Sequence, residues 1–81
     1  MQNTTELVLK KLEDITGTDQ VRQDLDMELF TEKMLDSFGT VELIVALSEE
    51  LGIELTPGQV NRETWATPRK IIRDIDARLG K

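Results

Sequence analysis

Cysteine and histidine are both absent from this chain of 81 residues. Without cysteine there is neither a disulfide nor a thiolate ligand for a metal ion. Without histidine the chain lacks the most common general base and the most common metal ligand of proteins. A serine–histidine triad is therefore excluded, and we expect no metal site and no catalytic residue of the chain's own.

Apolar runs long enough to cross a membrane are absent as well, and residues 1–6 lack the basic and apolar regions of a signal peptide. We therefore expect a cytoplasmic protein without direct membrane insertion. Internal repeats and low-complexity segments are also missing, and a chain this short has room for one core. The sequence predicts a single domain over residues 1–81, which we expect to be a monomer.

Positive charge is scarce in the middle of the chain, and the whole chain has a net charge of −6. Residues 34–61 contain no lysine or arginine, whereas acidic residues occur there at positions 36, 42, 49, 50 and 54. Nucleic acid should repel such a protein, and basic protein surfaces should attract it. The acidic segment is either a solvated helix surface or a docking surface for a basic partner.

Helical periodicity dominates what the sequence does contain. Apolar spacing and capping residues predict main helices over 4–15, 37–51 and 68–79. Asn61 can cap a further short helix over 62–65, and residues 20–36 form a long connection with a helical turn near 28–30. The sequence therefore predicts an all-α fold, a small four-helix bundle with three main helices and one short helix.

The helix predicted over 37–51 carries two apolar stripes that point in different directions. The stripe expected to face the core consists of Leu43, Ile44, Leu47 and Leu51, and the second stripe consists of Phe38, Val41 and Val45. Either the helix is buried on most sides, or the second stripe is a partner-binding surface. We favour the partner surface because Glu42 and Glu49 flank it.

Ser37 stands at the start of this helix, directly after Asp36, the expected N-cap. N–H groups in the first turn of a helix lack intrahelical partners and bear the positive end of the dipole, so a phosphate ester on Ser37 would be stabilised there. With no histidine to deprotonate it, this serine is better suited to accept a group from another enzyme. Gly39 either reflects tolerance near a helix end or lets a prosthetic group or partner approach the backbone.

Two segments are distinctive: residues 35–41, Leu-Asp-Ser-Phe-Gly-Thr-Val, and residues 65–71, Trp-Ala-Thr-Pro-Arg-Lys-Ile. Both resemble the acyl and peptidyl carrier protein family, and within it the D-alanyl carriers of Gram-positive bacteria. The resemblance covers essentially the whole chain. Phe38 departs from the methionine that is most common there, and Ser48 stands where many fatty-acid carriers have an acid, which argues against a fatty-acid carrier. Trp65 is expected to anchor the core rather than stack on a ligand.

This resemblance implies a carrier protein that is not an enzyme. It implies that Ser37, in a motif with Asp36, bears 4′-phosphopantetheine transferred from coenzyme A by a holo-carrier protein synthase. It further implies that a D-alanine–carrier ligase loads D-alanine as a thioester for a membrane-bound acyltransferase system that esterifies teichoic acids. The alternatives are a stand-alone acyl or peptidyl carrier for another synthase and, outside the family, an unmodified helical interaction module.

Overall fold

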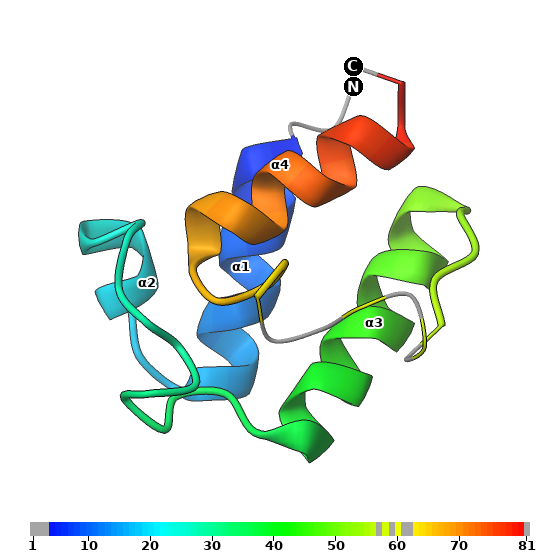
Figure 1. Ribbon diagram of the computed structural model, residues 1–81. Helices are drawn as coiled ribbons and strands as arrows, with labels where there is room; N and C mark the ends of the chain where they lie inside the picture. Colours follow the sequence, from blue (N-terminus) through cyan, green and yellow to red (C-terminus); the bar gives the residue numbers. More distant parts are fainter. Residues whose placement is uncertain (1–3, 57, 59, 61–62, 81) are drawn as a thin grey trace.

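The computed structural model describes residues 4–56, 58, 60 and 63–80, and these residues form helices but no strand (Figure 1). The helices are α1 (Thr4–Thr16), α2 (Gln20–Gln23), α3 (Ser37–Leu51) and α4 (Pro68–Arg78). α1 packs against α2, α3 and α4 and is the central element. The all-α fold predicted from the sequence is confirmed. In the described part of the chain, no helix is both long and apolar enough to span a membrane.

The core forms where the apolar faces of the three main helices meet. Leu12 of α1, Leu47 of α3 and Ile75 of α4 are shielded completely from solvent. Trp65, just before α4, is equally buried and belongs to the same cluster. Burial of such apolar surface is the main favourable term in folding. Trp65 therefore anchors the core, as the sequence predicted.

α3 begins and ends at the residues that the sequence predicted. The Asp36 carboxylate accepts a hydrogen bond from the N–H of Gly39 at 2.7 Å, which satisfies one free donor of the first turn. At the other end, Gly52 adopts a left-handed conformation with φ 65° and donates its N–H to the carbonyl of Ser48. The attachment candidate is thus the first residue of a helix whose two ends are both capped.

α4 begins with the capping residues that the sequence indicated. The Thr67 hydroxyl accepts a hydrogen bond from the N–H of Lys70 at 3.2 Å, and Pro68 occupies the first helical position, where no N–H is needed. The N–H of Arg69 has no partner within the helix and donates to the carbonyl of Leu25 at 3.0 Å. The start of α4 is therefore bound directly to the connection that leads to α3.

The short helix does not lie where the sequence predicted it. It is α2, at the beginning of the connection 20–36, whereas residues 63–65 form a turn and residues 61 and 62 lie outside the described residues. A helical turn near 28–30 is confirmed, because the N–H of Glu32 donates to the carbonyl of Glu28 at 2.9 Å.

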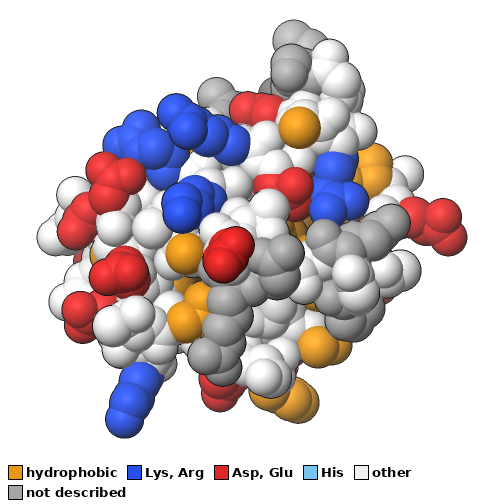
Figure 2. Space-filling model, in the orientation of Figure 1, with side chains coloured by type: hydrophobic (Ala, Val, Ile, Leu, Met, Phe, Trp, Pro, Cys, Tyr) orange, Lys and Arg blue, Asp and Glu red, His pale blue; other side chains and the backbone are white. Residues whose placement is uncertain are grey.

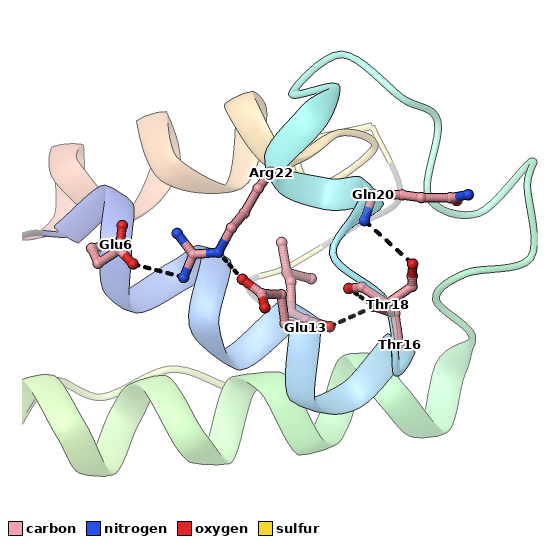
Figure 3. Close-up of polar contacts among 7 residues, drawn as sticks. Glu6, Glu13, Thr16, Thr18, Gln20 and Arg22 are labelled. Atoms are coloured by element: carbon pink, nitrogen blue, oxygen red, sulfur yellow. Dashed lines mark hydrogen bonds and ion pairs between the residues drawn. The ribbon is translucent and has the colours of Figure 1, made fainter.

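Tertiary contacts stabilise α2. A helix of four residues is far too short to form alone in water. Its Val21 is buried in the core, and its Arg22 lies between Glu6 and Glu13 of α1 (Figure 3). The hydrogen bond from Arg22 holds the pKa of the Glu6 carboxyl below its ordinary value. These contacts join residues distant in sequence, which is why local sequence patterns did not reveal the helix.

Candidate functional site

Ser37 is the first residue of α3 and is exposed to solvent. Hydrogen bonds to Asp36 shape the turn around it. The Asp36 carbonyl accepts the N–H of Thr40 at 2.8 Å and the Thr40 hydroxyl at 2.7 Å, while its carboxylate accepts the N–H of Gly39. The serine hydroxyl is therefore presented on a rigid helix start and remains accessible to another protein.

The first turn of α3 suits a phosphate ester. The N–H groups of Ser37 and Phe38 make no hydrogen bond to another described residue, and the turn contains no acidic residue. The Asp36 carboxylate, the nearest negative charge in sequence, is engaged by the N–H of Gly39. A phosphodiester on Ser37 would meet free donors and the positive end of the helix dipole. The residues present therefore fit such a group.

Gly39 has a structural role that neither sequence interpretation anticipated. It is buried, and a Cβ there would lie 3.2 Å from Ile15 Cγ2 and 3.2 Å from Leu35 Cδ1. Such distances are tighter than ordinary van der Waals contact. The missing side chain thus lets α3 approach the end of α1, on the inward side of the helix. Neither tolerance near a helix end nor access for a prosthetic group explains this position.

The second apolar stripe of α3 faces solvent. Phe38 is 73 % exposed, Val41 45 % and Val45 50 %. Leu43, Ile44 and Leu47 are buried, and Leu51 packs against the core. The two predicted stripes therefore do point in different directions, with one in the core and one on the surface. We call Phe38, Val41 and Val45 the apolar ridge.

Acidic side chains accompany the apolar ridge. Glu42 and Glu49 are exposed on α3, whereas Glu50 lies 3.5 Å from the Lys11 ammonium of α1. Basic side chains gather elsewhere, over the first turns of α4, as Figure 2 shows. The exposed surface of α3 is thus apolar and acidic. Such a surface complements a partner that offers an apolar hollow with a basic rim.

Trp65 is not available for stacking on a ligand. Its indole N–H donates to Asp74 Oδ2 at 2.8 Å, and the Arg78 Nε donates to the same oxygen at 3.0 Å. Among the described residues, no group of acidic side chains could hold a metal ion. The Ser37 hydroxyl is therefore the candidate group that we consider at this surface.

We call residues 36–40, the turn that contains Ser37, the attachment turn. Sequence reasoning missed the residues that hold it in place. The N–H of Leu29 donates to the carbonyl of Ala66 at 2.8 Å, and the Leu29 carbonyl accepts the N–H groups of Met34 and Leu35 at 2.8 and 3.1 Å. Leu29 and Leu35 are both buried. Hydrogen bonds therefore link Ala66, just before α4, through Leu29 to Leu35, which precedes Ser37 by two residues. In the sequence, only the scattered apolar residues of the connection 20–36 indicated that this segment packs against the core.

Comparison with known proteins agrees with this geometry. The family model for the phosphopantetheine attachment site matches residues 6–75. A D-alanyl carrier protein of Enterococcus faecalis is 47 % identical over 93 % of this chain and 96 % of its own length. D-alanyl carrier proteins of Listeria monocytogenes, at 43 % identity over 89 % of this chain and 92 % of their length, and of Lacticaseibacillus casei, at 42 % over 85 % of each chain, are also similar.

These matches have consequences for the attached group. Proteins of this family bear phosphopantetheine covalently, and the free N–H groups and accessible hydroxyl at the start of α3 fit that group. The matched segment contains the whole of α2 and α3 and most of α1 and α4. The chain belongs to the phosphopantetheine attachment family and, within it, to the D-alanyl carrier proteins.

Proposed function

We propose that this protein carries D-alanine as a thioester on a 4′-phosphopantetheine arm attached to Ser37, and delivers it for D-alanylation of teichoic acids. The observation that carries the proposal is the exposed Ser37 hydroxyl at the start of α3, in a chain similar to D-alanyl carrier proteins over nearly its whole length. The arm supplies the thiol that the chain lacks, since the sequence contains no cysteine.

The residues of the first turn have separate parts in this function. The Ser37 hydroxyl is the atom to which the phosphate is esterified, and the N–H groups of Ser37 and Phe38 stabilise its charge. Asp36 holds the turn in shape through its carboxylate and carbonyl, which receive hydrogen bonds from Gly39 and Thr40. The protein itself performs no bond-making step and presents the group to enzymes that do.

The partners in this proposal are a holo-carrier protein synthase, a D-alanine–carrier ligase and a membrane-bound acyltransferase system, all reached from the cytoplasm. The apolar ridge and the exposed Glu42 and Glu49 form the surface that each of them binds in turn. A shared surface of this kind allows one partner at a time, which suits a carrier that moves between enzymes. We take the carrier to be a single domain over 1–81 that works as a monomer.

Attachment is tested by intact-mass spectrometry after incubation with a holo-carrier protein synthase and coenzyme A. Wild type should gain the mass of one phosphopantetheinyl group, and Ser37→Ala should gain none. Ser48→Ala is the matched control, since it removes the other serine of the chain, away from the turn, and should still be modified. Label on Ser37→Ala, or no label on wild type, would refute the assignment of Ser37.

The cargo is tested on the modified protein with ATP, labelled D-alanine and a D-alanine ligase, beside a fatty-acid loading enzyme. We expect a stable thioester with D-alanine and poor fatty acylation. Specificity lies in the loading enzyme, because it discriminates among acids before the carrier receives one. Efficient fatty acylation without D-alanylation would instead identify a stand-alone acyl carrier for another synthase.

A further inference from the structure

An exposed ion pair closes the connection between α2 and α3 onto the start of α4. The Arg69 Nε lies 2.8 Å from Asp26 Oδ1, and the Arg69 Nη2 lies 3.5 Å from Asp26 Oδ2. The N–H of Arg69 also donates to the carbonyl of Leu25, the residue before Asp26. Arg69 therefore holds the connection with both its main chain and its side chain.

The place of Arg69 in α4 needs this acidic neighbour. It lies in the first turn, where the helix dipole disfavours a cation, and that turn contains no acidic residue. Asp26 supplies the missing negative charge from another segment. The hydrogen bond from Arg69, followed by the charges of Arg69 and Arg73, holds the pKa of the Asp26 carboxyl below its ordinary value. An aspartate and an arginine are both ionised at neutral pH, and this lowering keeps the pair charged further into the acid range.

The contacts of the connection carry this restraint towards Ser37. Leu25 and Asp26 are held by Arg69, and three residues further on Leu29 is held by Ala66. The Leu29 carbonyl in turn binds the N–H of Leu35, which precedes Ser37 by two residues. The side chains of Arg69 and Asp26 are 49 % and 70 % exposed, so opening their ion pair leaves the core intact.

We propose that the Asp26–Arg69 pair is a clasp that positions the attachment turn for the enzyme that modifies Ser37. This inference rests on the proposed function. Both are positioning residues, since neither belongs to α3 and their influence passes through Leu29 and Leu35. When the clasp opens, residues 25–35 sample further conformations, and the synthase meets the correct turn less often. Once bound, the synthase orders the turn itself.

The experiment compares wild type with Asp26→Ala, Arg69→Ala and the exchanged pair Asp26→Arg with Arg69→Asp. Lys70→Ala is the matched control, because Lys70 is the adjacent exposed cation and forms no ion pair with Asp26. Steady-state phosphopantetheinylation yields KM and kcat for each variant. Amide hydrogen exchange at Leu29 and Leu35 reports on the connection without any enzyme.

Each single clasp variant should raise KM roughly two- to fivefold with kcat unchanged, in keeping with the modest strength of exposed ion pairs. Exchange at Leu29 and Leu35 should accelerate by a similar factor. The exchanged pair should restore KM and the exchange rates, because it rebuilds the ion pair with the charges reversed. An acidic residue at position 69 also suits the helix dipole. Lys70→Ala should behave like wild type.

Two results would overturn the clasp. The first is an exchanged pair whose KM stays as high as that of Arg69→Ala although its amide hydrogen exchange at Leu29 equals that of wild type. Arg69 would then contact the synthase directly. If Lys70→Ala raises KM as much as Arg69→Ala does, the positive charge of this surface, and not the ion pair with Asp26, is what promotes binding of the synthase. A wild-type protein that the synthase does not modify would refute the proposed function, whereas the exchange measurements would still decide whether the clasp holds the connection.

Discussion

Both faces of α3 carry apolar side chains, yet one face is buried in the core and the other is exposed to solvent. Leu47 has no solvent exposure, while Val45, two residues earlier, is half exposed. Hydrophobicity therefore does not distinguish the faces; the element packed opposite does, since α1 covers one face. Phe38, Val41 and Val45 leave an exposed apolar surface on the helix that begins with Ser37, and we propose that a second protein covers it.

Truncation of the buried face should give the largest effect. Leu47→Ala leaves a cavity in the core and should lower the free energy of unfolding by about 2–5 kcal/mol. Val45→Ala, on the exposed face of the same helix, should cost less than about 1 kcal/mol. Urea unfolding followed by circular dichroism measures both values. Equal losses would mean that the two faces are not energetically distinct.

Adding a side chain to the buried face should give the next largest loss of stability. Gly39→Val pushes its methyl groups against Ile15 and Leu35 and should destabilise the fold by about 1–3 kcal/mol. Gly58→Val, where a Cβ meets open space, is the control and should be nearly neutral. The same unfolding assay applies. If Gly39→Val did not change the free energy of unfolding, α1 and α3 would be able to move apart enough to accept the added side chain.

A charge placed on the apolar ridge should impair function and spare the fold. Val41→Asp should lower kcat/KM for phosphopantetheinylation about tenfold or more, because a buried charge at the interface would lack a partner. Its melting temperature should stay close to that of wild type. Ala77→Asp, which adds the same charge at an exposed position of α4, should be modified normally. Normal modification of Val41→Asp would remove the ridge from the binding surface.

The acidic flank of the ridge should give the smallest effect. Raising salt from low to physiological ionic strength should slow association with the synthase a few-fold, because the Debye length shortens to about 8 Å. The double variant Glu42→Gln with Glu49→Gln should show a weaker salt dependence. Stopped-flow fluorescence measures the association rate. A rate that ignores salt would argue that these glutamates are only solvated.

Local signals were sufficient for the helix that carries the site. Asp36 and Gly52 delimit α3, and Thr67 with Pro68 starts α4, as the sequence predicted. Each of these residues acts on backbone groups within a few positions of itself, so its effect can be read without the rest of the fold. The exposed serine at a helix start followed from the same reasoning.

Contacts between distant segments were beyond that reasoning. α2 depends on Arg22 reaching Glu6 and Glu13, and the attachment turn depends on Leu29 reaching Ala66. No periodicity or capping rule marks such pairs, because their partners are brought together only when the chain packs. For the same reason the short helix was expected at 62–65 and found at Gln20–Gln23.

The sequence by itself determined three properties of this protein: the absence of cysteine and histidine, the limits of α3 and the position of Ser37. None of them depends on how the helices pack. They leave a serine without a base, at a helix start that favours a phosphate. The sequence also favoured Leu43 and Leu47 for the core, and what only the packing decided is that the second stripe stays uncovered, with Val41 45 % and Val45 50 % exposed. The reason is that a second apolar stripe could equally be buried in a small bundle, and only the placement of the neighbouring helices determines whether it loses contact with water.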